Sequence, residues 1–162
     1  MKTIYLAGGC FWGTQKFFDQ FAGVVATQVG YANGKTAAPT YEEVCAGSDH
    51  AETVKIDFDE SIISLDDLLR YYFMTIDPLS INRQGNDTGR QYRTGIYYTD
   101  PSLLPAIQAA VQAQEQKCGG PLAVEVTGLE QFYPAEEYHQ KYLDKHPGGY
   151  CHIPRHLLNM QQ

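Results

Sequence analysis

The sequence predicts an α+β protein built as a two-layer α/β sandwich, with helices packed on a mixed sheet. Strand-like and helix-like segments alternate along the chain, and neither a dinucleotide-binding fingerprint nor a P-loop accompanies them. The chain has 162 residues, of which 43% are hydrophobic and 19% charged, as is typical of a folded domain with its own core. We therefore expect a single domain, residues 1–162, in which residues 147–162 form a flexible tail.

The first third of the chain predicts a strand, a helix and a second strand. Residues 3–6 are a short apolar run that leads into Gly8-Gly9, which indicates a buried strand and a tight turn. Residues 24–31 alternate loosely as a strand and end at the turn signal Ala32-Asn33-Gly34. Between them, aromatic residues at helical spacing predict one apolar helix face: Phe11, Phe17, Phe18 and Phe21.

The middle third predicts another strand, a helix and a functional loop. Val54, Ile56 and Phe58 alternate as in a half-buried strand, and Ser64 is a suitable N-cap for the helix that follows. Residues 77–92 are polar and glycine-rich, and long polar loops in small domains are usually functional. The helix after Ser64 has an apolar stripe formed by Leu65, Leu68, Leu69, Tyr72, Phe73 and Ile76.

The last third predicts one longer helix, a strand, a short helix and a tail. The longer helix lies within residues 101–118 and is closed by Gly119-Gly120. Residues 122–126 read as a strand and residues 135–146 as a short helix, whereas residues 150–162 show no periodicity. Together the elements predict a sandwich with a ferredoxin-like core and an irregular C-terminal tail.

Charge and composition exclude several classes of function. The formal net charge is −7, so binding to nucleic acid or to an anionic membrane is not expected. No apolar stretch approaches the roughly 18 residues that a membrane helix needs. Residues 1–9 lack the apolar region of a secretory signal peptide, and we expect a cytoplasmic protein.

The four cysteines leave packing, metal binding and redox chemistry open as roles. They are too sparse for a disulfide scaffold, and no two of them form a CxxC pair, so the commonest zinc and thioredoxin-type signatures are missing. We expect no bound metal or cofactor. Cys10 stands where the first strand ends and the first helix begins. Unpaired backbone N–H groups at a helix start lower the pKa of a thiol, and the adjacent glycines allow close approach. The sequence therefore indicates a nucleophilic thiolate at Cys10, against the alternative of a packed apolar cysteine.

Seven short sequence blocks, taken together, point to one family. In chain order they are Gly9-Cys10-Phe11-Trp12-Gly13, Gly30-Tyr31-Ala32-Asn33-Gly34, Pro39-Thr40-Tyr41-Glu42-Glu43-Val44-Cys45, His50-Ala51-Glu52, Gln84-Gly85-Asn86-Asp87, Gln91-Tyr92-Arg93 and Gly149-Tyr150-Cys151. They resemble the blocks of the peptide methionine-(S)-sulfoxide reductases, the A class of methionine sulfoxide reductases. The resemblance spans nearly the whole chain and implies a single catalytic domain that reduces methionine-(S)-sulfoxide in proteins and peptides, and free methionine sulfoxide as well.

The resemblance also implies a role for each residue of the site. Cys10 would attack the sulfoxide sulfur, while Glu52, kept protonated by a partly apolar site, would supply the proton to the oxygen. Tyr41 and Tyr92 would donate hydrogen bonds to that oxygen. The remaining positions carried over are Asp87, which supports this network, and Phe11 and Trp12, which form an apolar slot for the substrate methyl group.

A second cysteine is needed to remove the sulfenic acid that this reaction leaves on Cys10. By the resemblance that resolving thiol is Cys151, which follows two glycines in the tail. Cys118 continues the apolar face of its predicted helix and is expected to pack, and Cys45 carries no family role. Because no cysteine follows Cys151, we expect thioredoxin to reduce the Cys10–Cys151 disulfide directly.

Three positions depart from the family pattern. Asn33 stands where glycine is usual, Ser48-Asp49 where Thr-Gly is common, and Ile76-Asp77-Pro78 where His-Asp-Pro is typical. None of these positions belongs to the reacting groups. The change at Asp49 is the one expected to affect the loop that leads to Glu52.

Two other classes of function stay open at this point. One is a cysteine hydrolase in which His50 or His139 activates Cys10 as its base. The other is a non-catalytic thiol redox sensor or peptide-binding module. A hydrolase would form an acyl-enzyme with an ester or amide, and a sensor would not turn over methionine sulfoxide.

Overall fold

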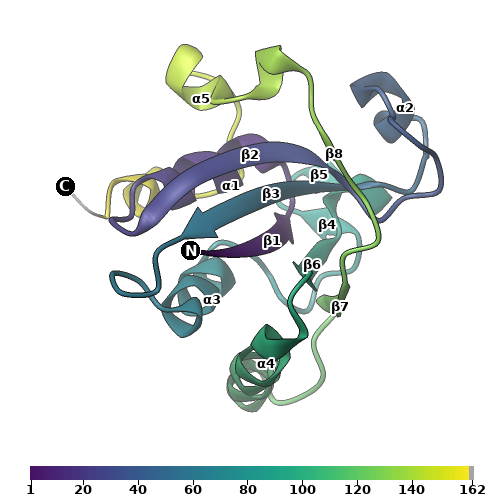
Figure 1. Cartoon of the computed structure of the whole chain (residues 1–162). Coiled ribbons are helices and arrows are strands. Elements are labelled where there is room, and N and C mark those ends of the chain that lie inside the picture. The colour runs from purple at the N-terminus through teal and green to yellow at the C-terminus, as the bar shows by residue number, and fades with distance from the viewer. Residues whose placement is uncertain (161–162) are drawn as a thin grey trace.

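The computed structural model describes residues 1–160 as an α+β sandwich (Figure 1). Within these residues the strands are β1 Lys2–Gly8, β2 Val24–Ala32, β3 Ala51–Phe58, β4 Arg83–Gln84, β5 Asp87–Thr88, β6 Thr94–Tyr98, β7 Glu125–Gly128 and β8 Phe132–Pro134. The α-helices are α1 Phe11–Asp19, α2 Tyr41–Cys45, α3 Leu65–Met74, α4 Leu104–Cys118 and α5 Tyr142–Lys145. None of the helices in this described part is long and apolar enough to cross a membrane.

The main sheet is mixed, as predicted. Over residues 1–160 its strand order is β7-β6-β1-β3-β2-β8, and β4 and β5 form a separate two-stranded ribbon. β6 and β7 pair in parallel, whereas the other neighbouring strands pair antiparallel. The central strands β1 and β3 position two of the predicted site residues, because Cys10 follows β1 and Glu52 lies on β3.

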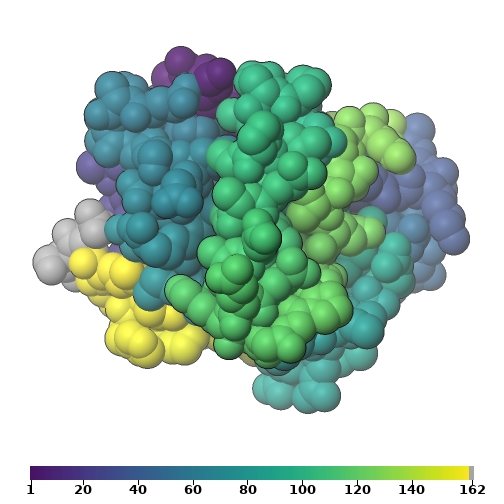
Figure 2. Space-filling view, turned by 90° about the horizontal axis from the view of Figure 1, so that it is seen from below, coloured from purple at the N-terminus to yellow at the C-terminus, as the bar shows by residue number. Residues whose placement is uncertain are grey.

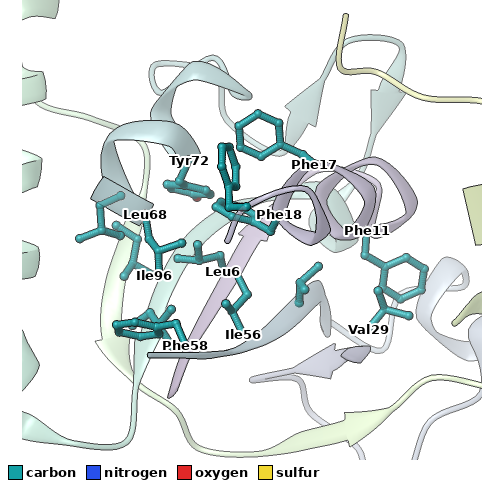
Figure 3. Packing of buried hydrophobic residues seen from close by; sticks show 14 of the residues in the cluster. Leu6, Phe11, Phe17, Phe18, Val29, Ile56, Phe58, Leu68, Tyr72 and Ile96 are labelled. Carbon is teal, nitrogen blue, oxygen red and sulfur yellow. The ribbon is translucent and has the colours of Figure 1, made fainter. Parts of the chain in front are cut away.

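The two faces of the sheet carry different cores. Alternate residues of β1 point to opposite faces, so Ile4 and Leu6 join the large cluster under the helices, while Tyr5 and Ala7 join a small cluster on the other face. The large cluster combines β-strand residues with aromatic side chains of α1 and α3, as Figure 3 shows for Leu6, Phe18 and Tyr72. The helices α1 and α3 are thereby fixed on one face of the sheet.

The helix boundaries follow from local capping chemistry. The Ser64 side chain accepts a hydrogen bond from the Asp67 backbone N–H at 3.0 Å, which confirms the predicted start of α3. Gly119 ends α4 with a left-handed φ of 78°, a conformation that glycine adopts without steric cost. Figure 2 shows α4 crossing the lower face of the molecule, where it packs beside α3.

Most of the predicted helices and strands are confirmed. The elements that differ from the prediction are short ones. The strand predicted over residues 122–126 begins later, at Glu125, and the helix predicted over residues 135–146 is two separate pieces, the 3₁₀ helix Glu137–His139 and α5. The elements that were not predicted include α2, which has Val44 as its only buried residue, and β8, a three-residue edge strand that contains a proline. They also include the short strands β4 and β5, which lie inside the loop predicted over residues 77–92.

The C-terminal segment is anchored to the body of the protein. Ile153 is 2% exposed and Leu158 7% exposed, and both belong to the large core cluster. The Gln20 side chain, one residue beyond α1, donates to the Leu157 carbonyl oxygen at 2.8 Å and accepts from the Met160 N–H at 2.6 Å. The segment is thus irregular, as predicted, but packed along α1; its flexibility stays a prediction, and Gln161 and Gln162 lie outside the described residues.

Phe18→Ala tests the importance of the core beneath the sheet. Phe18 is fully buried and its ring packs edge-on against Phe17, with the ring centroids 5.0 Å apart. The substitution leaves a cavity, and we expect it to lower the free energy of unfolding by about 3–5 kcal/mol. Ile62→Ala, at a side chain that is 61% exposed, is the control and should change it by less than about 1 kcal/mol. Equal effects in urea unfolding would contradict this assignment of the core.

Candidate active site

The turn between β1 and α1 places Cys10 at the start of a helix, as the sequence predicts. Gly9 has a left-handed φ of 85°, and a Cβ on it would lie 2.8 Å from Gln84 Cβ. A Cβ on Gly8 would lie 3.0 Å from Ile76 Cγ2. Both positions therefore favour glycine. The tight turn brings Cys10 to the N-cap of α1 with 7% of its surface exposed.

The predicted thiolate with a lowered pKa at Cys10 is wrong for the resting site. Burial raises the pKa of the thiol well above its ordinary value, and the nearby Glu52 raises it further. The backbone N–H of Trp12 has the expected lowering effect, but it is the smaller influence. The resting thiol is therefore neutral, because removing it from water costs more than the helix start contributes.

Glu52 is a buried carboxyl group at the N-terminus of α1. It lies on β3 opposite Tyr31 of β2, on the helix-covered face that it shares with Val54. The side chain is 1% exposed, and its Oε1 accepts a hydrogen bond from the Phe11 backbone N–H at 3.2 Å. Its Oε2 is buried without a hydrogen-bond partner. Burial raises the pKa of Glu52 to about 8, so the carboxyl group is mostly protonated at neutral pH.

Tyr41, Tyr92 and Asp87 come from three different segments and meet near Glu52. Tyr41 begins α2 and Tyr92 ends the 3₁₀ helix Arg90–Tyr92, and burial, followed by the charge of Glu52, raises the pKa of both phenols. Asp87 lies on β5, where burial raises the pKa of its carboxyl group and Tyr150 opposes the rise. The site therefore combines two neutral phenols with two carboxyl groups whose pKa values are raised by burial.

The two aromatic residues after Cys10 differ in their exposure. Phe11 is 1% exposed and belongs to the large core cluster. Trp12 is half-buried and stacks on Tyr142 with the ring centroids 3.8 Å apart. Its Nε1 donates a hydrogen bond to His139 Nδ1 at 2.9 Å. Trp12 is thus held on two sides while one surface stays accessible.

Sequence reasoning missed the residues that position this site. Glu136 accepts hydrogen bonds from the Tyr31 hydroxyl at 2.8 Å and from the Tyr41 backbone N–H at 3.0 Å, and so joins β2 to the start of α2. His139 and Tyr142 hold Trp12 in place. All three lie in residues 135–146, which the sequence predicts as a short helix, with His139 considered only as a base of the alternative hydrolase. The sequence feature that could have indicated their role is the clustering of polar and aromatic side chains, Glu136, His139 and Tyr142, in one short segment.

Cys151 lies against α1 one turn beyond Cys10. A Cβ on Gly13 would be 2.7 Å from Cys151 Sγ, so this sulfur rests directly on the glycine. Cys151 is half-buried, and its sulfur also contacts the Ile153 carbonyl oxygen at 3.5 Å. Cys151 is among the groups that raise the pKa of Cys10. The structure therefore brings the two cysteines to the same end of α1, and both are free thiols.

The other two cysteines occupy different surroundings. Cys45 is exposed at the end of α2 and hydrogen-bonds with the side chain of Tyr41. Cys118 is half-buried at the end of α4, where Gln114 Nε2 lies 3.7 Å from its sulfur. Neither is among the groups that most affect the pKa of Cys10.

The departures from the family pattern are accommodated locally. Asn33 and Asp49 both have left-handed backbones, with φ of 52° and 68°, the conformation for which glycine is favoured. Asn33 Oδ1 accepts the backbone N–H of Glu130 at 2.8 Å. Asp49 Oδ1 accepts from Arg90 Nε at 2.7 Å, and this hydrogen bond lowers the pKa of Asp49. Side-chain contacts thus support both turns without glycine.

The histidines of the alternative hydrolase have other partners. His50 is fully buried, with Nδ1 2.9 Å from Ser48 Oγ, and burial lowers its pKa. His139 Nδ1 accepts the Trp12 hydrogen bond and is therefore not available as a base at that atom. In residues 1–160, no three His, Cys, Asp or Glu side chains are grouped as they would be to hold a metal.

Comparison with known proteins gives a consistent result. The family described as peptide methionine sulfoxide reductase matches residues 2–162. The peptide methionine sulfoxide reductase MsrA of Lachnoclostridium phytofermentans is 58% identical over 153 residues, which cover 94% of this chain and 92% of the relative. That of Clostridium acetobutylicum is 51% identical over 159 residues, which cover 98% of each chain.

Solved structures agree with the sequence relatives. Reduced Mxr1 from Saccharomyces cerevisiae superimposes with a TM-score of 0.88 at 37% identity, covering 93% of this chain and 88% of that chain. Methionine sulfoxide reductase A of Corynebacterium diphtheriae gives 0.84 at 36% identity, covering 94% and 82%. A structure of Mxr1 in complex with Trx2 shares the fold, with a TM-score of 0.62 at 24% identity and coverage of 87% and 84%.

The raised pKa of Glu52 predicts a pH dependence of stability. Folding raises this pKa from an ordinary 4.5 to about 8, so between these values the folded protein binds more protons than the unfolded chain. The stabilisation from Glu52 is complete below pH 4.5 and is lost as the pH rises through about 8. The free energy of unfolding of wild type relative to Glu52→Gln should fall across this window, by at most about 1.4 kcal/mol per pH unit. A constant difference in urea unfolding from pH 5 to 9 would rule out the raised pKa.

Proposed function

Because the chain belongs to the peptide methionine sulfoxide reductase family, we propose that it reduces the S epimer of methionine sulfoxide in proteins and peptides, with Cys10 as nucleophile and Glu52 as acid. Free methionine sulfoxide is a further substrate in this proposal, and the cytoplasm its setting. Reduction of methionine sulfoxide itself follows from the family. The observation that carries the residue assignment is the buried, unpartnered Oε2 of Glu52 beside the Cys10 thiol.

In the first step Cys10 Sγ attacks the sulfoxide sulfur. Glu52 gives its proton to the sulfoxide oxygen as negative charge develops there, and the proton released by the Cys10 thiol restores Glu52. The products are methionine and a sulfenic acid on Cys10, so the substrate sulfur is reduced and the cysteine sulfur is oxidised. The raised pKa of Glu52 supports this assignment because an acid must hold its proton at the working pH.

Tyr41 and Tyr92 donate hydrogen bonds to the oxygen in this proposal, and Asp87 supports their network. Both phenols have raised pKa values and remain donors at neutral pH. The substrate methyl group lies against Trp12, with Phe11 behind it. Since the donors and the apolar wall are on fixed elements, only one epimer directs its oxygen to Glu52 while its methyl group contacts Trp12.

Cys151 resolves the sulfenic acid in the second step. Its sulfur attacks Cys10 Sγ, the oxygen leaves as water, and a Cys10–Cys151 disulfide forms. The contact of Cys151 with Gly13 supports this role, because the resolving thiol already lies one helical turn from Cys10. Neither Cys45 nor Cys118 rests on α1 in this way.

Thioredoxin is the proposed reductant of that disulfide. The chain has no cysteine after Cys151 that could act as a further internal thiol. Yeast Mxr1, 37% identical to this chain, has also been solved in complex with Trx2. A dithiol reductant supplies the two electrons and two protons that return both cysteines to thiols.

Single-turnover measurements separate the two cysteines. Cys10→Ser should abolish reduction, since an alcohol is not a comparable nucleophile. Cys151→Ser should release about one methionine per enzyme and then stop with thioredoxin as the reductant, because no disulfide can form. Cys45→Ser and Cys118→Ser are the matched controls and should keep both the burst and steady turnover. Full thioredoxin turnover in Cys151→Ser would show that another thiol resolves the sulfenic acid.

Gly13→Ala tests the contact between α1 and Cys151. Alanine inside a helix normally stabilises it, but here its Cβ would stand 2.7 Å from Cys151 Sγ and displace the sulfur. We expect an unchanged methionine burst and disulfide formation slowed by about tenfold or more. Rapid-quench trapping of the sulfenic acid measures this rate. An undiminished rate would mean that Cys151 reacts from a different position.

A further inference from the structure

A cavity of about 170 Å³ adjoins Cys151. It lies between Lys16 of α1, Asp144 of α5 and the C-terminal segment, where Gly149, Cys151 and Arg155 line it. The Cys151 sulfur is therefore approachable from this cavity. Cys10, by contrast, is 7% exposed and does not line it.

The cavity is separate from the proposed substrate side of the site. None of the residues assigned to substrate lines it, namely Phe11, Trp12, Tyr41, Glu52, Asp87 and Tyr92. The cavity adjoins that group of residues at the redox pair, because Cys151 lies on Gly13 one turn from Cys10. A molecule in the cavity would thus reach Cys151 without passing the substrate position.

The charged residues of the cavity leave it with an excess of positive charge. Lys16 Nζ is paired with Asp144 at 2.5 Å, which balances those two charges. Arg155 is exposed and donates to the Pro147 carbonyl oxygen at 3.3 Å, and the described residues offer it no acidic partner within ion-pair distance. Burial raises the pKa of Cys151, and the charge of Arg155 acts against that rise. Arg155 is therefore close enough to influence negative charge at this sulfur.

We propose that this cavity admits the attacking cysteine thiolate of thioredoxin to Cys151, and that Arg155 favours its approach through its positive charge. The proposal rests on the Cys10–Cys151 disulfide of the proposed function. The cavity is large enough for one cysteine side chain, and a positively charged wall attracts an anionic nucleophile.

The reaction in the cavity is a thiol–disulfide exchange. The incoming thiolate attacks Cys151 Sγ, the bond between Cys10 and Cys151 breaks, and Cys10 leaves as a thiolate that takes up a proton. The second thiol of the reductant then attacks the mixed disulfide and releases Cys151. The reductant ends as a disulfide, so two electrons pass to the enzyme and no other reactant is needed.

Small thiols of opposite charge provide the first test. The enzyme is oxidised with one equivalent of a methionine sulfoxide peptide, and peptide mapping verifies the Cys10–Cys151 disulfide. Its reduction is then followed with anionic 3-mercaptopropionate and with cationic cysteamine, each rate being corrected for the fraction of thiolate. The rate with 3-mercaptopropionate divided by the rate with cysteamine should fall by about tenfold in Arg155→Glu and by less in Arg155→Gln. This ratio should also become less sensitive to salt.

Matched controls and thioredoxin complete the test. Arg70, an exposed arginine of α3 that does not line the cavity, provides Arg70→Glu and Arg70→Gln, which should leave the ratio unchanged. Arg155→Glu should also slow reduction by thioredoxin, while the methionine burst stays at the wild-type amplitude. An unchanged ratio in Arg155→Glu overturns the proposal, and so does a changed ratio with unimpaired thioredoxin reduction. Absence of the mapped disulfide would instead overturn the proposed function on which this inference rests.

Discussion

The site depends on one constraint, the burial of the Glu52 carboxyl group under the first turn of α1. The hydrogen bond from the Phe11 N–H holds Oε1 at 3.2 Å and leaves Oε2 unpartnered. Ionising a carboxyl group in this position has a high desolvation cost, so the group keeps its proton at neutral pH. The same closed environment suppresses ionisation of Cys10. In the proposed reaction the acid and the nucleophile are therefore both protonated before substrate binds, so proton transfer to the sulfoxide oxygen and loss of the thiol proton have to be coupled.

The fold creates this constraint through close backbone approaches. Side-chain alternation on β3 directs Glu52 to the same face as Val54, under the helix layer. Gly9 allows the tight turn that returns the chain over that face, and Gly13 leaves space for Cys151 on α1. A larger residue at either position would separate the groups that react in the proposed function. Strand β3 thus fixes the proposed acid, Glu52, while the glycines set its distance to the two sulfurs.

Sequence patterns predicted what depends on local periodicity and missed what depends on tertiary contact. The strand-turn-helix at Cys10 and the stripe of α3 were visible because regular apolar spacing encodes them. α2 was missed because it buries only one residue, although Thr40 and Glu43 form a capping box whose spacing was readable. The pKa of Cys10 was predicted in the wrong direction because the fold buries the thiol and brings Glu52, 42 positions along the chain, close to it.

The two steps of the proposed cycle, sulfoxide reduction and disulfide reduction, are favoured by different local charges. Sulfoxide reduction begins with an uncharged substrate, and the site that meets it is neutral because burial keeps Cys10 and Glu52 protonated. Disulfide reduction begins with a thiolate, and the cavity beside Cys151 contains the unbalanced charge of Arg155. One shared entrance could not favour both the uncharged sulfoxide and the anionic thiolate. In the proposed cycle the sulfoxide reaches Cys10 and the thiolate reaches Cys151, one helical turn of α1 away, so each step has its own electrostatic environment.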